Sequence, residues 1–97
     1  MNRTDLTAVV ADATGLTTHQ AAEAVAATLA GIARGMAEEG SVALPGFGTF
    51  ERRARAARTG RNPQTGEPIE IAASVAPAFK PAAALRRQVA AGRPAEN

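Results

Sequence analysis

Residues 50–79 read FERRARAARTGRNPQTGEPIEIAASVAPAF. Two segments with the residue pattern of β-strands flank a turn in the middle of this stretch. Pro63 presets φ at the first position of a loop over residues 63–66, and Gly66 can supply a positive φ at the last. After the loop, Ile69 and Ile71 alternate with polar or small residues, as in a strand with two different faces. The sequence therefore predicts a β-hairpin closed by a four-residue loop.

The length of this hairpin sets its relation to the rest of the domain. If the loop joins Asn62 to Glu67, unbulged pairing places Phe50 opposite Phe79, and the two aromatic rings meet at its base. From Arg52 to the tip the strand has about 11 residues, or ~35 Å at ~3.3 Å per residue. A whole domain of this size has a radius of gyration of only about 12–13 Å. The hairpin is therefore expected to project as an arm.

Two helices are predicted before the hairpin. The first runs from about residue 3 to residue 14, with Asn2 as its N-cap and Gly15 as its stop. The second begins at the capping box formed by Thr17 and Gln20 and ends at Gly40. Its apolar residues recur at steps of 3, 4, 3 and 4, the spacing with which one helix packs along another. These seam residues are Ala22, Val25, Leu29, Ile32 and Met36.

Short strands connect the helices to the arm. Val42 and Leu44 belong to the first, a turn follows at Pro45, and the second is expected to run from Phe47 without interruption through Arg58. Together with the return strand of the hairpin they predict a three-stranded antiparallel sheet. Helices followed by strands give the fold class α+β.

The chain is expected to end in a short helix over residues 81–90, with Pro81 in its first turn. Leu85 and Val89 would point inward from this helix, and Arg86 and Arg87 outward. Residues 91–97 lack apolar anchors and are expected to form a disordered tail.

The apolar residues are too small to build a substantial core in one copy of the chain. Of the residues counted as hydrophobic, 45% of the total, 25 are alanine, which leaves 6 Val, 5 Leu, 3 Ile, 3 Phe and 2 Met. A fully buried large side chain contributes only about 1.5–3 kcal/mol, so a folded monomer would be marginal. We therefore expect a homodimer that shares its core.

Composition also argues against several classes of function. The chain has no cysteine, and His19 is its only histidine, so we expect no metal site and no cofactor. Adjacent Glu38 and Glu39 point apart on a helix, and Ser41 and Ser74 have no base to activate them, so we expect no enzyme and no small-molecule substrate. No apolar run approaches the ~18 residues of a membrane span, and a soluble cytoplasmic protein is expected.

Charge is distributed unevenly along the chain, although the net charge is only +2. Residues 1–50 carry 2 Arg against 5 acidic residues, whereas residues 51–97 carry 8 Arg and 1 Lys against 4. Five of these arginines, and no acidic residue, lie between Glu51 and Glu67. Arginine forks suit phosphates, so the arm is predicted to contact a polyanion. The alternative is that these arginines form a solvent-exposed strand face that binds no partner.

The sequence resembles the HU/IHF family of bacterial histone-like DNA-bending proteins over residues 1–90. The likeness lies in residues 46–50 (GFGTF), 58–66 (RTGRNPQTG) and 78–80 (AFK). It implies an α+β intertwined homodimer with a helical body, three-stranded sheets forming a saddle, and two protruding β-ribbon arms. It also implies a nucleoid-associated protein that binds double-stranded DNA in the minor groove with little sequence specificity, bending and compacting it.

Within that single histone-like domain, residues 1–40 would form the helical dimerisation part and residues 41–80 the sheet and DNA-binding arm. The resemblance implies that arginines line the arm, that Pro63 is an intercalating wedge flanked by Asn62 and Gln64, and that further basic residues hold phosphates on the body. The expected DNA-binding residues are Arg3, Arg53, Arg55, Arg58, Arg61, Asn62, Pro63, Gln64, Lys80, Arg86 and Arg87. The expected dimer interface comprises Val25, Leu29, Ile32, Met36, Phe47, Phe50 and Phe79.

Some residues depart from the pattern of the family. Glu67 and Glu70 lie on the return strand where many relatives are basic, and Ala83 is uncharged in a helix that often carries lysine. Two alternatives therefore stay open. One is an interaction module that uses the same dimer to bind proteins, and the other is a relative with IHF-like preference for particular DNA sequences.

Overall fold

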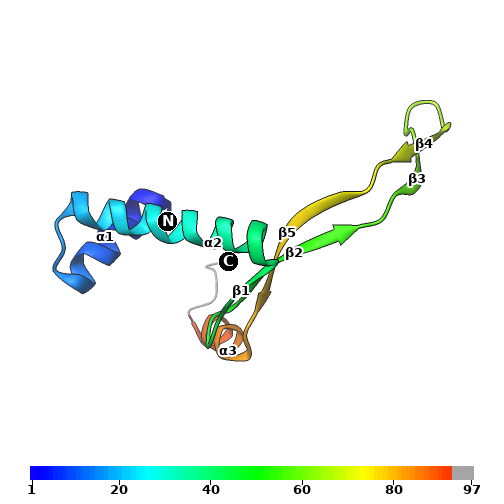
Figure 1. The fold of residues 1–97 in the computed structure, drawn as a ribbon. Coiled ribbons are helices and arrows are strands. Elements are labelled where there is room, and N and C mark those ends of the chain that lie inside the picture. Colours follow the sequence, from blue (N-terminus) through cyan, green and yellow to red (C-terminus); the bar gives the residue numbers. More distant parts are fainter. Residues whose placement is uncertain (93–97) are drawn as a thin grey trace. The chain divides into compact units, whose positions relative to one another are not determined.

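The computed structural model describes residues 1–92, and the chain divides into two compact units, Met1–Gly35 and Met36–Asn97. Helix α1 (Arg3–Thr14) lies in the first unit, and helix α2 (Thr18–Glu39) begins there and ends in the second. The second unit continues with strands β1 (Ser41–Leu44), β2 (Gly48–Arg55), β3 (Arg58–Arg61), β4 (Pro68–Ile71) and β5 (Ser74–Pro81), followed by helix α3 (Ala83–Ala91) (Figure 1).

The predicted N-cap at Asn2 and the predicted capping box of Thr17 and Gln20 are confirmed, and Asn2 and Asp5 form a second capping box. The Asn2 side chain accepts a hydrogen bond from the Asp5 N–H at 2.9 Å, and the Asp5 carboxylate accepts one from the Asn2 N–H at 3.1 Å. Thr17 and Gln20 exchange the equivalent bonds at 3.1 and 3.0 Å. These bonds satisfy backbone donors that have no partner within the helix. The helix boundaries therefore follow from signals local in sequence.

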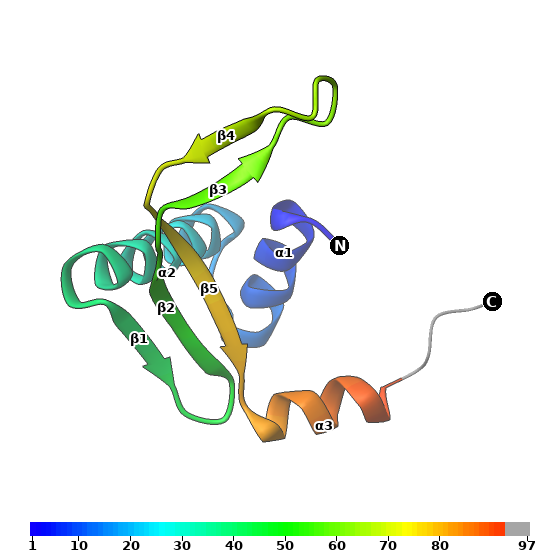
Figure 2. The same cartoon turned by 90° about the vertical axis from the view of Figure 1, so that its right-hand side faces the viewer.

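The three-stranded sheet has the order β1-β2-β5, and both pairings are antiparallel, as the sequence predicts (Figure 2). Phe50 pairs with Phe79, and their ring centroids lie 4.7 Å apart. Phe47 joins the cluster at 5.6 Å from the Phe79 ring, although it lies in the turn before β2 and not in the strand as expected. A Cβ at Gly48 would come within 2.6 Å of both the Lys80 carbonyl oxygen and the Phe79 ring, so only glycine fits there.

Two expectations at the end of the chain are wrong. Pro81 is the last residue of β5, paired with Gly48, and α3 begins only at Ala83. The Ala82 N–H donates to the Phe47 carbonyl at 2.9 Å, which holds this segment extended past the proline. Val89 is 71% exposed rather than turned inward. Of the expected tail, Ala91 lies in α3 and residues 93–97 lie outside the described residues.

The described residues bury very little apolar surface. Only Ala21 and Val25 are buried hydrophobic residues within residues 1–92, and no large side chain in that range is fully buried. Leu29 is 47% exposed and Phe47 46% exposed. Such a small core is far below what a stable domain of this size needs.

Candidate nucleic-acid interface

The arm is a two-stranded ribbon whose register is the same on both sides of an interruption. β2 pairs with β5 as far as Arg55 opposite Ser74, and β3 pairs with β4 from Arg58 opposite Ile71 (Figure 1). The unbulged register predicted from the loop is therefore confirmed. The expectation of one uninterrupted strand from residue 47 to residue 58 is wrong, because Ala56 and Ala57 belong to no strand.

Alanines account for this interruption. Ala56 and Ala57 face Ala72 and Ala73 across the ribbon, and none of the four belongs to a strand. Alanine is depleted in strands and adds almost no cross-strand side-chain contact, so nothing beyond the backbone favours the ladder here.

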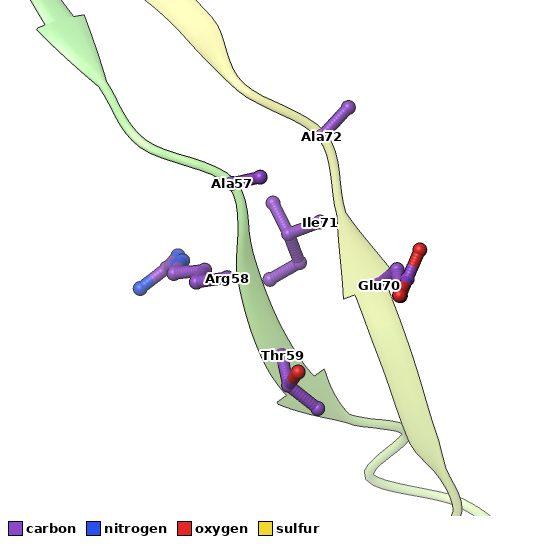
Figure 3. Close-up of a pocket in the computed structure, with 6 residues that line it drawn as sticks. All are labelled: Ala57, Arg58, Thr59, Glu70, Ile71 and Ala72. Atoms are coloured by element: carbon purple, nitrogen blue, oxygen red, sulfur yellow. The ribbon is translucent and has the colours of Figure 1, made fainter.

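An open hollow lies beside the interruption (Figure 3). Arg58 and Glu70 point away from the ribbon on opposite sides, and Ile71 lies between the two strands. All the residues that line the hollow are exposed, so it is part of the ribbon surface and not an enclosed binding site. The lining residues are Ala57, Arg58, Thr59, Glu70, Ile71 and Ala72.

The arm arginines point to both faces of the ribbon. Successive residues of a strand point to opposite faces, so Arg53 and Arg55 share one face of β2 and Arg52 lies on the other. By the same rule Arg58 and Arg61, three residues apart, point to opposite faces of β3. A ribbon charged on both faces can contact both walls of a phosphate-lined groove.

Arg52 is bound to the end of helix α2. One of its Nη atoms donates to the Ala37 carbonyl at 2.8 Å, and its backbone N–H donates to the Gly40 carbonyl at 2.9 Å. The Ala37 carbonyl lies in the last turn, where helical acceptors lack partners and a cation is favoured. Arg52 therefore fixes the start of the arm to the helix.

Arg52→Ala is expected to lower the free energy of unfolding by about 0.5–1.5 kcal/mol, because it removes a hydrogen bond at a helix end. The salt dependence of any polyanion binding should stay as in the wild type, since this guanidinium faces the protein. Denaturant unfolding measures the expected change in stability, and a salt titration measures the dependence of polyanion binding on salt. A variant of unchanged stability with a flatter salt dependence would contradict this assignment.

Arg53 forms an ion pair with Glu51 in the same strand. The Arg53 side chain is 56% exposed, and an exposed pair contributes only about 0–1 kcal/mol. A phosphate can therefore replace the Glu51 carboxylate at little cost. Within residues 1–92 the other contact of this kind joins His19 Nε2 and a Glu23 carboxylate oxygen at 2.9 Å, so neither Glu67 nor Glu70 forms an ion pair with an arm arginine.

The tip is closed by backbone and side-chain hydrogen bonds. The Asn62 N–H donates to the Glu67 carbonyl at 2.8 Å, and the Gly66 N–H donates to the Asn62 carbonyl at 2.7 Å. The Asn62 side-chain oxygen accepts from the Gln64 N–H at 2.8 Å. Gly66 has φ of +73°, as the turn sequence predicts. Pro63 and Gln64 are exposed at the end of this closed loop.

The remaining predicted site residues lie outside the arm. Arg3 lies in α1 of the first unit, whereas Lys80 in β5 and Arg86 and Arg87 in α3 belong to the second. All four are exposed. The structure thus brings the predicted arm residues together on one ribbon.

Sequence reasoning missed several residues that shape the arm. The Thr65 hydroxyl accepts a hydrogen bond from the Glu67 N–H at 3.3 Å. Threonine in a turn often bonds the backbone two residues further along, and this preference could have suggested the contact. A Cβ at Gly60 would lie 2.9 Å from the Ile71 Cδ1, so the absence of a side chain at Gly60 leaves room for Ile71 to pack against β3. A glycine inside a strand is the signal that could have found it.

Other kinds of site are absent from the part of the chain that the structure describes. Residues 1–92 contain no group of three His, Asp or Glu side chains that could hold a metal ion. No helix in this range is long and apolar enough to cross a membrane.

Comparison with known proteins identifies similar chains over almost the whole length. A family described as bacterial DNA-binding protein matches residues 1–90. DNA-binding protein HU of Streptococcus thermophilus is 56% identical over 88 residues, covering 91% of this chain and 97% of the relative. DNA-binding protein HU of Geobacillus stearothermophilus is 51% identical over 89 residues, covering 92% and 99%.

Two solved structures extend the likeness to the fold. An Anabaena HU-DNA cocrystal structure matches with a TM-score of 0.86 and 40% identity, covering 95% of this chain and all of the other. The solution structure of a mutant of transcription factor 1 matches with a TM-score of 0.65 and 38% identity, covering 93% and 91%.

Proposed function

This chain belongs to the family of bacterial DNA-binding proteins that includes HU, and we propose that it binds duplex DNA with little sequence specificity, bending and compacting it in the nucleoid. The resemblance found in the sequence is thereby confirmed. We further propose that the chain acts in the cytoplasm as an architectural protein and not as an enzyme.

One observation carries this proposal: a two-stranded ribbon bears Arg53, Arg55, Arg58 and Arg61 and ends in a closed loop with Pro63 exposed. Neutralising phosphates with arginines releases counterions from DNA, which favours binding independently of sequence. An apolar residue at the tip of such a ribbon can part a base step and kink the duplex. Asn62 and Gln64 flank this wedge, while Arg3, Lys80, Arg86 and Arg87 would contact phosphates.

The protein is proposed to act as a homodimer. In the first unit an apolar hollow of about 200 Å³ is lined by residues of both helices, and the half-exposed Leu29 is one of them. In the second unit Phe47 and Phe79 are also partly exposed. A second copy would bury these surfaces and supply the core that one chain lacks. The hollow is lined by Leu6, Val10, Val25, Thr28 and Leu29.

Gel shifts at several salt concentrations test the function. Two duplexes of unrelated sequence should bind with similar affinity, and the logarithm of the binding constant should fall linearly with the logarithm of salt concentration. A nicked duplex should bind more tightly than an intact one, because its bases are already partly unstacked. If one sequence outcompetes random DNA by about 10³ or more, the protein is a sequence-specific relative. If no salt-dependent association occurs, the DNA function is wrong.

Arg58→Ala is expected to weaken binding to all duplexes alike. The salt slope should flatten by about 1 for each phosphate that the arm no longer neutralises, and a dimer lacks two arginines after this substitution. Arg58 is exposed and, within residues 1–92, its side chain makes no hydrogen bond, so the variant should fold as the wild type does. If Arg58→Ala binds duplex DNA at moderate salt with the affinity of the wild type, Arg58 does not contact DNA.

A further inference from the structure

We propose that Arg61 is a positioning residue for the tip of the arm: its guanidinium holds the loop closed so that Pro63 is presented in a fixed orientation. This inference rests on the proposed function, in which the tip enters DNA. It changes the role expected for Arg61, because binding a phosphate depends on charge whereas positioning depends on the geometry of the loop.

The hydrogen bond that carries the proposal spans the loop from one side to the other. An Nη atom of Arg61 donates to the Gly66 carbonyl at 2.9 Å, five residues further along the chain. Arg61 itself is the last residue of β3 and Gly66 the last residue of the loop. The side chain thus bridges the strand end and the far end of the turn.

Gly66 is consequently held through both of its peptide groups. Its N–H donates to the Asn62 carbonyl at 2.7 Å, and its carbonyl accepts from Arg61. Pro63, Gln64 and Thr65 lie between Asn62 and Gly66, so the exposed part of the loop is anchored at each end.

The backbone next to the loop needs this support. Arg61 pairs with Pro68 directly next to the Asn62–Glu67 hydrogen-bonded pair, and in an antiparallel ladder such a neighbouring pair exchanges no backbone hydrogen bond. Gly66 adopts a positive φ, and glycine has more conformations available than any other residue once its hydrogen bonds are broken. A side chain that fixes the Gly66 carbonyl therefore limits the freedom of the intrinsically most flexible residue in the loop.

A fixed loop matters because a wedge must enter a stacked base step. A loop that is already ordered loses less conformational freedom when it inserts, so more of the binding free energy remains for unstacking. A loosened loop would let the arm stay bound through its other arginines without inserting Pro63. Loss of Arg61 should therefore reduce bending more than binding.

Arg58 provides a matched control. It lies in the same strand, carries the same charge and is also exposed, yet it makes no side-chain hydrogen bond within residues 1–92. Arg58→Ala and Arg61→Ala thus remove equal charge, and only the second removes the hydrogen bond to Gly66. Arg61→Lys retains the charge, but lysine is one bond shorter and lacks the planar fork.

The first measurement uses the protein without DNA. Water-exchange NMR should show the Gly66 amide exchanging about tenfold or more faster in Arg61→Ala, because loss of a charged hydrogen bond to the Gly66 carbonyl, worth about 1.5 kcal/mol or more, frees the residue whose N–H is held on the Asn62 carbonyl. Arg58→Ala should leave this rate as in the wild type. An unchanged Gly66 rate in Arg61→Ala would overturn the proposal.

The second measurement uses duplex DNA saturated with protein and labelled at both ends. Fluorescence transfer should report a smaller bend for Arg61→Ala than for Arg58→Ala, while Arg61→Lys should keep the wild-type salt slope and still bend less. Equal bends for Arg61→Ala and Arg58→Ala would contradict the positioning role.

The two measurements separate this inference from the proposed function. If the wild-type protein does not bind DNA but its Gly66 amide responds to Arg61→Ala, the function is wrong and the hydrogen bond across the loop stands. If the wild-type protein bends DNA and the Gly66 amide does not respond, the positioning role is wrong and the function stands.

Discussion

Leu29→Glu is expected to abolish cooperative folding at micromolar protein concentration. Within residues 1–92 the only buried hydrophobic residues are Ala21 and Val25, so in the proposed homodimer the free energy of folding comes largely from surfaces that the second copy covers. Leu29 lines the apolar hollow and is 47% exposed in a single chain. A carboxylate there would be buried without a partner, at a cost of several kcal/mol for each copy. Circular dichroism during heating measures the loss.

Ala30→Glu is the control for this variant. Ala30 is exposed and lies seven residues after Glu23 and four before Arg34, on the polar face of α2. The control should melt like the wild type, whose midpoint should itself rise with protein concentration. If Leu29→Glu sediments as a monomer and still unfolds cooperatively, the shared core of the dimer is wrong.

Pro63→Ala is expected to remove most of the DNA bend while retaining most of the salt-dependent attraction. As a turn former the proline contributes only about 0.4–1 kcal/mol, by restricting the unfolded chain. As a wedge it offsets an unstacking cost of a few kcal/mol per base step. Ligase closure of DNA fragments shorter than the persistence length, about 150 bp, measures the bend, because such fragments close slowly unless they are bent.

Gln64→Ala serves as the control, because it changes the next exposed residue of the same loop and leaves the proline in place. It should accelerate ring closure nearly as well as the wild type. If Pro63→Ala accelerates ring closure as strongly as the wild-type protein, Pro63 is a turn residue only.

Local signals made much of the fold predictable. The first helix with its N-cap Asn2, the capping box of Thr17 and Gln20, and the loop over residues 63–66 follow from residues near one another in sequence. In a hairpin the length of the loop fixes which residues of the two strands pair. The predicted four-residue loop therefore placed Phe50 opposite Phe79 correctly.

The errors arose where tertiary interactions decide between two local conformations. Pro81 suits the first turn of a helix, but pairing with Gly48 and the bond from Ala82 to Phe47 keep it in an extended segment. The break at Ala56 and Ala57 was not predicted, because the alternating arginines on both sides indicate one continuous strand. The weak cross-strand packing of alanine, which favours the break, depends on the residues of the opposite strand.

The arm itself was predictable from charge, whereas the individual roles of its arginines were not. Arg52 bonds to a carbonyl 15 residues earlier in the chain, and only the structure brings the two together. Arg61 and Arg58 look alike in sequence, yet only Arg61 reaches the Gly66 carbonyl. The roles of the predicted DNA-binding residues stay predictions until such variants are measured.

Fluorescence transfer across a short duplex labelled at both ends reports binding and bending together, the two events that the proposed function combines. On addition of the wild-type protein, transfer should rise to a plateau that is the same for two unrelated sequences. Raising the salt concentration should return transfer to the value of DNA alone, and the logarithm of the binding constant from these titrations should fall linearly with the logarithm of salt concentration. Binding at low salt without any rise in transfer would show that the protein does not bend DNA, and a complete lack of binding would show that duplex DNA is not its ligand.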